Sequence, residues 1–146
     1  DTLNGKGGDD ILVGGADDDT LDGGNDDDIL LGGFGDDALT GGLGNDTFKW
    51  EAGETGTDII TDWGTGTNIL DLSDLLQGET TATLDDFLDF SYDTNTSDTT
   101  LTIDVDGSGN DNDQVIVFDN VDLTQLGNDD QAIITNLLTN NQLITD

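Results

Sequence analysis

Residues 5–49 read GKGGDDILV GGADDDTLD GGNDDDILL GGFGDDALT GGLGNDTFK. This stretch is one nine-residue pattern repeated five times, in which the sixth position is always aspartate and the eighth is always apolar. Asp1 and Leu3 fit the same two positions of a truncated upstream copy. A fixed period this short predicts a parallel solenoid, a fold dominated by β-structure, rather than an ordinary globular pattern. The sixth-position residues are Asp10, Asp19, Asp28, Asp37 and Asp46, and the eighth-position residues are Leu12, Leu21, Leu30, Leu39 and Phe48.

Each repeat divides into a six-residue turn and a three-residue strand. Glycine dominates positions one, two and four of the turn, where the backbone needs positive φ or a close approach to a neighbour. In a strand such as Ile11–Val13 successive side chains point to opposite faces, so only the middle residue points inward. Two repeats then complete one coil, and repeats two apart stack on the same edge. The expected stacks are Asp10, Asp28 and Asp46 on one edge and Asp1, Asp19 and Asp37 on the other.

The stacked aspartates predict a metal site. Two carboxylates one strand spacing apart, about 4.7–4.9 Å, repel each other strongly unless a cation lies between them. Calcium accepts six to eight oxygen ligands in a tolerant geometry, and turn carbonyls can supply those that the carboxylates do not. Magnesium demands a stricter octahedron, and zinc prefers nitrogen or sulfur ligands, whereas the chain has no histidine or cysteine. The pattern therefore predicts calcium as the cofactor.

The charge of the chain restricts its partners. Its 146 residues include 34 acidic residues and two lysines, Lys6 and Lys49, with no arginine or histidine, which gives a formal net charge of -32. Such a surface repels nucleic acid and anionic membranes, because both need cationic contacts. Without metal, closely spaced carboxylates repel one another, so we expect a disordered chain under those conditions. With calcium we expect a folded monomer.

Composition also argues against several classes of protein. The absence of cysteine excludes a disulfide framework and a thiol enzyme, and no apolar run approaches the roughly 20 residues needed to insert across a membrane. A serine triad would lack its histidine base. A paired-carboxylate glycosidase stays possible by composition, but the expected calcium sites use the obvious carboxylate pairs. We therefore expect no enzyme. The N-terminus lacks the pattern of a signal peptide and begins inside a repeat, so we expect a fragment of a longer chain.

After Phe48 the nine-residue period ends, so we divide the chain into a roll at 1–48 and a capping region at 49–146. The capping region is expected to cover the strand edges of the last coil, which a solenoid otherwise leaves open. A polar loop between two alternating segments predicts a hairpin, and acidic caps with helical spacing predict a terminal helix. The expected elements are strands at 58–63, 99–105 and 114–118, a strand running into a short helical turn at 69–76, a helix passing into a strand at 84–92, and a helix at 129–138.

Two further groups of aspartates are weaker metal candidates. Asp58 and Asp62 could meet near the end of the roll and hold a capping ion, or they could belong to a solvated strand face. The aspartates of the hairpin loop lack the closing glutamate and the preceding helix of an EF-hand, so a plain loop is the better interpretation. The hairpin aspartates are Asp104, Asp106, Asp111 and Asp113.

The repeats resemble the RTX (repeats-in-toxin) β-roll, a family of calcium-dependent proteins exported by type I secretion. The resemblance implies a right-handed parallel β-roll with about three complete calcium sites and a partial fourth. In that family each ion takes the aspartate and the carbonyls of positions two and four from one turn, with the aspartate and the carbonyls of positions one and three from the stacked turn. Carried over by position, the first site would use Lys6, Gly8, Asp10, Gly23, Asn25 and Asp28. The second would use Gly24, Asp26, Asp28, Gly41, Leu43 and Asp46. The third would use Gly15, Asp17, Asp19, Gly32, Phe34 and Asp37, and the partial fourth Asp1, Gly14, Ala16 and Asp19.

Three residues depart from the family's glycine pattern. Lys6 replaces glycine at position two, where only its carbonyl is needed. Asp17 and Asp26 replace glycine at position four, and we expect modest strain, because aspartate tolerates the left-handed region better than most residues. The fifth-position aspartates are expected to face solvent as an acidic edge. They are Asp9, Asp18, Asp27 and Asp36.

The rest of the chain resembles a narrower group, the type I secretion C-terminal target domain at the end of very large bacterial RTX adhesins. That resemblance implies an uncleaved export signal in the last segment, read by an ABC transporter complex, and upstream adhesin domains on the surface of bacteria that often form biofilms or live in the sea. It implies a module that is unfolded at cytosolic calcium and folds after secretion. The segments that carry it are DTFKW (46–50), DIITDWGTGTNILDLSDLLQGE (58–79), TLTIDVDGSGNDNDQVIVFDNVDLT (100–124) and ITNLLTNNQLITD (134–146).

Two other functions stay open at the level of sequence. The same module could end a secreted protease or lipase and serve as its export device. The roll could also bind a surface such as ice, although ice-binding solenoids resemble regular threonine or asparagine ladders. Position seven, which points outward, is irregular here: Ile11, Thr20, Ile29, Ala38 and Thr47.

Overall fold

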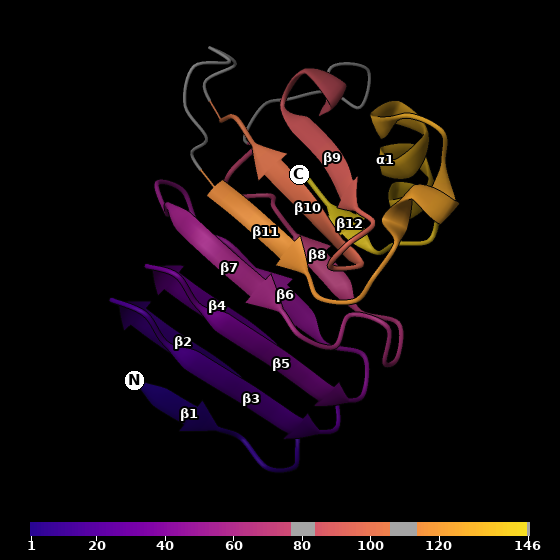
Figure 1. Cartoon of the computed structure of the whole chain (residues 1–146). Coiled ribbons are helices and arrows are strands. Elements are labelled where there is room, and N and C mark those ends of the chain that lie inside the picture. The colour runs from indigo at the N-terminus through magenta and orange to yellow at the C-terminus, as the bar shows by residue number, and fades with distance from the viewer. Residues whose placement is uncertain (77–83, 106–113, 146) are drawn as a thin grey trace.

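The computed structural model describes residues 1–76, 84–105 and 114–145. Most of the elements in these ranges are short strands (Figure 1). In chain order they are β1 (Thr2–Asn4), β2 (Ile11–Ala16), β3 (Thr20–Asn25), β4 (Ile29–Phe34), β5 (Ala38–Leu43), β6 (Thr47–Lys49), β7 (Gly56–Ile60), β8 (Ile69–Asp71), the 3-10 helix η1 (Leu84–Asp86), β9 (Leu88–Asp93), β10 (Asp98–Ile103), β11 (Gln114–Phe118), the 3-10 helix η2 (Leu123–Leu126), α1 (Asp130–Thr139) and β12 (Leu143–Ile144).

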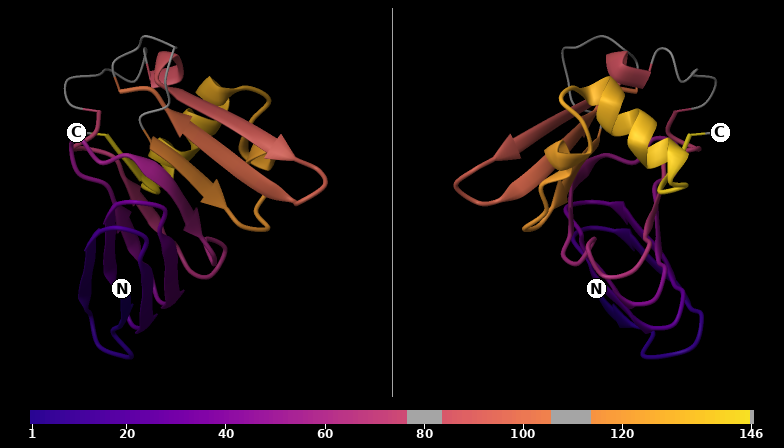
Figure 2. Two further views of the ribbon diagram at one scale, coloured as in Figure 1. Left: turned by 60° about the vertical axis from the view of Figure 1, so that its left-hand side comes forward. Right: turned by 90° about the vertical axis from the view of Figure 1, so that its right-hand side faces the viewer.

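The strands form a parallel β-solenoid of about four turns, as the nine-residue period predicts. Odd-numbered strands β1, β3, β5 and β7 are neighbours in one sheet, and β2, β4, β6 and β8 are neighbours in the other. The chain therefore alternates between two sheets that face each other across the roll, with the N-terminal coil at one end (Figures 1 and 2).

Stacking along the roll follows a register of 18 residues, two repeats, so that equivalent positions lie directly over one another. Leu12 pairs with Leu30, and Leu30 pairs with Phe48. Leu12 is 5% exposed, whereas its neighbours Ile11 and Val13 are 71% and 54% exposed, so only the middle residue points inward, as expected. Strands β2 to β5 have six residues rather than the expected three, because their pairing continues into the first half of the turn, whereas β1 and β6 have three.

Two more strands extend the solenoid after the nine-residue period has ended. Ala38 pairs with Ile59 and Thr47 pairs with Ile69, which are offsets of 21 and 22 residues. The loops before β7 and β8 are thus longer than a repeat turn, but each returns the chain to the register of the preceding coil. The last coil therefore has the strand arrangement of the repeats, although its turns do not keep the nine-residue spacing.

The C-terminal part covers both open edges of the last coil, as expected. β11 pairs in parallel with β7, and β10 and β9 continue that sheet in antiparallel order, which confirms the hairpin. β12 pairs in parallel with β8 and completes the other sheet. The terminal helix is α1, and the Asp129 carboxylate caps it by accepting the Ala132 N–H at 2.9 Å. The helix expected at the start of 84–92 is only the 3-10 turn η1, after which β9 begins.

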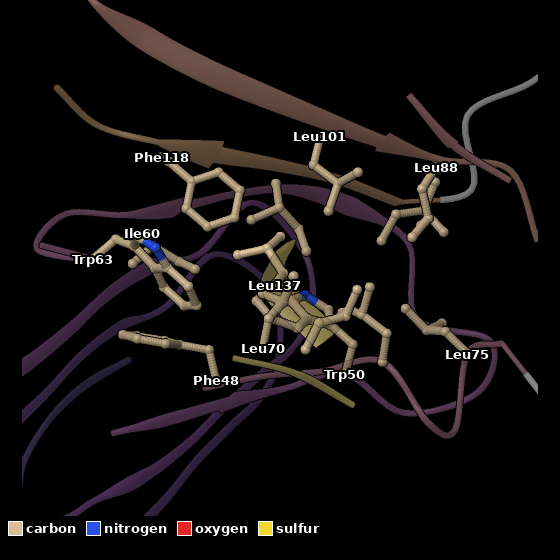
Figure 3. Close-up of a cluster of buried hydrophobic side chains, with 14 of the residues drawn as sticks. Phe48, Trp50, Ile60, Trp63, Leu70, Leu75, Leu88, Leu101, Phe118 and Leu137 are labelled. Carbon is tan, nitrogen blue, oxygen red and sulfur yellow. The ribbon is translucent and has the colours of Figure 1, made fainter. Parts of the chain in front are cut away.

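The hydrophobic core widens from the roll into the cap. Inside the repeats it is one inward residue per strand, and beyond Phe48 it takes in aromatic side chains from several elements (Figure 3). Trp63 lies between Phe48 and Phe118, with ring centroids 6.1 Å and 5.2 Å away. Leu137 of α1 reaches the same cluster, which joins the helix to the end of the roll.

Candidate metal sites in the stacked turns

The backbone of the turns has the conformation that the glycine pattern predicts. Positions two and four have positive φ in all five turns. Non-glycine residues occupy three of these positions, with φ of 77° at Lys6, 70° at Asp17 and 75° at Asp26. These residues hold the left-handed conformation at a cost of roughly 1–2 kcal/mol each. The other seven positions are Gly8, Gly15, Gly24, Gly33, Gly35, Gly42 and Gly44.

The sixth-position aspartates form two ladders along the roll, one on each edge. In each rung the backbone N–H of one aspartate donates to carboxylate Oδ1 of the aspartate 18 residues later. The amino-terminal nitrogen of Asp1 makes the equivalent contact with Asp19 Oδ1. The ladders bring together the aspartates that the sequence predicts to stack. The rungs run from Asp10 to Asp28 (2.8 Å), Asp28 to Asp46 (3.0 Å) and Asp19 to Asp37 (2.8 Å).

The second carboxylate oxygen of each sixth-position aspartate in the five repeats, called the repeat aspartates below, is buried and has no hydrogen-bond partner among the described residues. Leaving a buried acceptor unsatisfied costs about 1–3 kcal/mol, and more when the group is charged. Five such oxygens in one small roll are suited to bind a positively charged group. They are Oδ2 of Asp10, Asp19, Asp28, Asp37 and Asp46.

Each of the first three unpaired oxygens converges with a carbonyl of the next stacked turn. A Cβ placed on Gly5 would lie 2.6 Å from both Asp10 Oδ2 and the Gly23 carbonyl oxygen. A Cβ on Gly14 would lie 2.5 Å from Asp19 Oδ2 and 2.6 Å from the carbonyl oxygen of the next turn. Glycine at position one thus keeps open a cradle lined by two acceptors from different turns. The three cradles pair Asp10 with Gly23, Asp19 with Gly32 and Asp28 with Gly41.

The donor set fits a hard cation. A carboxylate oxygen and a carbonyl oxygen repel each other, so a cation that binds both is the simplest way to satisfy them. Calcium prefers such oxygen ligands. No group of three or more Asp, Glu, His or Cys side chains suited to a metal gathers in residues 1–76, 84–105 and 114–145. Phe34 and Leu43 can serve at position three, because their side chains are exposed and only their carbonyls would bind.

The four expected ligand sets stay predictions, because their carbonyl ligands rest on the resemblance. In the first set, Lys6 carbonyl oxygen accepts hydrogen bonds from the Asn25 N–H at 3.1 Å and from Asn25 Nδ2 at 3.2 Å. An ion bound to that carbonyl would compete with the Asn25 amide. Gly8, also in that set, donates its N–H to Asp26 Oδ2 at 3.0 Å.

Burial raises the pKa of the inner ladder carboxyls. For Asp28, Asp37 and Asp46 desolvation is the largest cause. The backbone N–H that donates to each carboxylate lowers its pKa in part, and the neighbouring aspartates raise it again by like-charge repulsion. Without a bound cation the charged form of these groups is therefore disfavoured inside the fold.

Both ladders end on residues that the sequence analysis did not place in them, Asp58, which was expected to pair with Asp62, and Asn68, which was not singled out. Asp37 N–H donates to Asp58 Oδ1 at 2.9 Å, and Asp46 N–H donates to Asn68 Oδ1 at 2.9 Å. In these last rungs the protein itself supplies a partner for the second polar atom of the side chain, which is Oδ2 in Asp58 and Nδ2 in Asn68. Asp58 Oδ2 accepts from Trp50 Nε1 at 2.6 Å and from Gln114 Nε2 at 2.7 Å, and Asn68 Nδ2 donates to the Trp63 carbonyl at 3.2 Å.

A signal for these rungs is present in the sequence. Residues 56–60 read GTDII and 66–70 read GTNIL, which keep the last three turn positions and the strand of a repeat such as GDDAL at 35–39. The first half of each turn has been replaced by a longer loop, so the nine-residue count hides the match. The hypothesis that Asp58 and Asp62 share an ion is wrong. Asp62, two residues beyond the end of β7, accepts the N–H groups of Gly41 and Gly42, whereas both oxygens of Asp58 accept from Asp37, Trp50 and Gln114.

The fifth-position aspartates are exposed, as expected, but they also form a hydrogen-bonded ladder. In this ladder the later turn donates and the earlier carboxylate accepts, the reverse of the sixth-position direction. Asp36 N–H donates to Asp18 Oδ1 at 3.0 Å, and Thr57 N–H continues the row by donating to Asp36 Oδ1 at 2.8 Å. Of the hairpin aspartates, Asp106, Asp111 and Asp113 lie outside the described residues.

Comparison with known families supports this reading of the turns. The model of the RTX calcium-binding nonapeptide repeat matches residues 1–30 and 14–48. Residues 1–48 are RTX calcium-binding repeats. The RTX β-roll is a structural calcium-binding fold, and RTX repeats are typical of secreted bacterial proteins. No curated protein matches the chain. Among the described residues, no helix is both long and apolar enough to cross a membrane.

Proposed function

We propose that the chain is a non-catalytic folding and export module whose folding depends on calcium. The observation that carries this proposal is the row of buried, unpaired Oδ2 atoms on the repeat aspartates. These atoms leave the fold incomplete without a cation, and a chain of net charge -32 offers little internal positive charge in its place. Calcium would supply the positive charge at these turns, held by the aspartate carboxylates and the carbonyls facing them.

Low calcium would keep the module unfolded before export. Extracellular calcium modules bind with Kd values of about 10⁻⁴–10⁻³ M, far above the calcium concentration of a cytosol. The stacked carboxylates would then repel one another, and the buried acceptors would stay unsatisfied. An unfolded chain suits passage through a narrow type I secretion channel, with the C-terminus leaving first.

Calcium outside the cell would drive folding, because binding to sites that exist only in the folded chain contributes directly to folding free energy. The arrangement of the C-terminal strands supports a role as the folding end of the molecule. β11 and β12 complete the two sheets of the roll at β7 and β8, so the exported end would form a closed surface on which earlier coils can stack.

The export signal and the adhesin context rest on the resemblance of the C-terminal segments. We place the signal in residues 134–146, which include the end of α1 and the strand β12. The upstream protein would be a surface adhesin of a bacterium. An RTX hydrolase with the same C-terminal module would be exported unfolded and would fold on calcium by the same mechanism.

Circular dichroism during a calcium titration tests the proposed function. We expect little β-structure in chelator and a cooperative gain of β-structure at sub-millimolar to millimolar calcium. Magnesium at the same concentrations is the control, and it should produce much less change, because it loses its water shell reluctantly and requires a stricter geometry. A spectrum that is already that of the folded chain in chelator would contradict the proposal.

A further inference from the structure

The junction between the roll and the cap holds unpaired acceptors that the repeat sites do not explain. The described residues contain six buried side-chain atoms without a hydrogen-bond partner, and five of them are the repeat Oδ2 atoms. The sixth is Gln114 Oε1 of β11, on the side chain that donates to Asp58. Asp37 is the last repeat aspartate on that same edge, and its N–H donates to Asp58.

The direction of the ladder shows where Asp37 Oδ2 points. In the three cradles, each Oδ2 converges with a carbonyl of the turn that follows it 18 residues later. The register continues unbroken from Asp37 to Asp58 through the hydrogen bond between them. Asp37 Oδ2 therefore faces the following loop, 50–58, which lies outside the nine-residue repeats. None of the expected ligand sets includes a residue of that loop.

This loop brings a buried acid to the junction. Glu54 is only 7% exposed, and its Oε2 accepts the Glu51 N–H at 2.9 Å. The next residue, Thr55, accepts the Gly35 N–H on its carbonyl at 3.4 Å, which fixes the loop against the turn that contains Asp37. Burial raises the pKa of Glu54, the Glu51 N–H lowers it in part, and repulsion from the Glu51 and Asp37 carboxylates raises it again.

The opposite edge of the roll is built differently at the same level. There Thr65 Oγ1 donates to the Gly42 carbonyl at 2.9 Å, and Asn68 Nδ2 donates to the Trp63 carbonyl at 3.2 Å. In the repeat turns, carbonyls at these positions are expected to bind the ion. Here the carbonyls of Gly42 and Trp63 accept hydrogen bonds from side chains instead. The nearby carboxylate of Asp62 accepts two backbone N–H groups. On that edge both oxygens of the Asp62 carboxylate accept backbone N–H groups, whereas on the Asp37 edge the buried Glu54 carboxylate accepts the Glu51 N–H on Oε2.

We propose an additional calcium site at the roll–cap junction, bound by Asp37 Oδ2 and the Glu54 carboxylate together with carbonyls of the turn 32–37. It differs from the repeat sites because one of its carboxylates comes from the loop 50–58 and not from a stacked repeat. Gln114 Oε1, one residue along the hydrogen-bond chain from Asp58, is a further acceptor at this junction. An ion here would tie the loop to the last RTX turn. The inference rests on the proposed function, since both require calcium as the cation.

Counting bound ions by native mass spectrometry at saturating calcium tests the junction site. Glu54→Gln keeps the shape of the side chain and an acceptor for the Glu51 N–H, but it removes the charge. Its matched control is Glu51→Gln, the same change on an exposed residue of the same loop. We expect Glu54→Gln to bind one ion fewer than the wild type and Glu51→Gln to bind the same number. Equal counts in all three proteins would overturn the site.

A crystal structure of the wild-type chain grown with calcium gives a second test, which does not depend on how a substitution affects folding. We expect an anomalous density peak within bonding distance of Asp37 Oδ2 and a Glu54 carboxylate oxygen. Peaks in the repeat turns with none at the junction would overturn this inference and leave the proposed function standing. A folded chain without calcium peaks anywhere would overturn both.

Discussion

The repeat coils and the coil formed by β7 and β8 complete the same aspartate ladder with different groups. In the repeats, one carboxylate oxygen accepts a backbone N–H and the other is buried without a partner. In the last coil, Trp50 and Gln114 donate to the second oxygen of Asp58, and the amide of Asn68 replaces the other carboxylate. The backbone stacking is the same in both regions. The two regions differ in the group that satisfies the rung, which is a protein donor in the last coil and, in our proposal, a cation in the repeats. The proposed dependence on calcium therefore lies with the sixth-position aspartates of residues 1–48.

The largest expected effect comes from removing the carboxylate that the first two ligand sets share. Asp28→Ala should raise the calcium midpoint of folding at least about tenfold, because even outer-shell partners typically cost about 10–100-fold in metal affinity. Asp27→Ala is the matched control: its side chain is the exposed neighbour in the same turn. Calcium titrations followed by circular dichroism measure both variants. An unchanged midpoint for Asp28→Ala would show that the register of the sites is wrong.

A methyl group in one cradle should have the next largest effect. Gly14→Ala puts a Cβ at 2.5 Å from Asp19 Oδ2 and 2.6 Å from the Gly32 carbonyl, so these acceptors must move apart. We expect about 1–3 kcal/mol of destabilisation, as for other overpacked sites, and the loss of one bound ion. Gly7→Ala is the control, since its Cβ would meet nothing closer than Asn25 Nδ2 at 3.5 Å. Urea unfolding at saturating calcium compares them, and similar stabilities would argue against the cradle.

Replacing the amide of Asn68 by a carboxylate gives a rung of the last coil the composition of a repeat rung, and this tests the same comparison. Asn68→Asp removes the donor to the Trp63 carbonyl and places a second carboxylate beside the Asp46 rung. At low calcium we expect a loss of about 1–3 kcal/mol, the cost of an unsatisfied buried polar group. At saturating calcium the loss should shrink. Urea unfolding at both calcium concentrations measures this, and an equal loss at both would mean that the rung does not respond to the ion.

The smallest expected effect is that of pH. Burial raises the pKa of Asp28, Asp37 and Asp46, and it raises the pKa of Asp58 to about 6. A carboxyl with a higher pKa in the folded chain than in the unfolded chain stabilises the fold at low pH, and this contribution is lost as pH rises through the folded pKa. Protons also compete with calcium for the same oxygens. The calcium-free fold should therefore gain stability on going from about pH 7 to about pH 5.

The calcium midpoint should rise over the same pH interval by less than about tenfold, the change that one pKa unit produces. Parallel calcium titrations at the two pH values measure it. A midpoint that falls on acidification would contradict the assignment of the unpaired oxygens as ligands.

The sequence predicts the solenoid, its 18-residue stacking and the two columns of aspartates, because glycine, aspartate and leucine recur at fixed positions that each have one physical purpose. It predicts the terminal helix and the hairpin from equally local patterns. It did not reveal the last coil, because the turns before Asp58 and Asn68 changed length and hid the surviving GTD and GTN segments. Glu54 and Gln114 could not be assigned from sequence, since only tertiary packing brings a loop and a strand 56 residues beyond Asp58 to the end of the ladder.

Hydrogen exchange at the ladder amides tests the central claim most directly. Each of the N–H groups of Asp10, Asp19 and Asp28 donates to a carboxylate whose other oxygen has no protein partner. Exchange followed by NMR should show these amides protected in calcium and exchanging rapidly both in chelator and in magnesium. If the same amides are equally protected in all three solutions, the ladder is complete without calcium, and the unpaired oxygens are not calcium ligands.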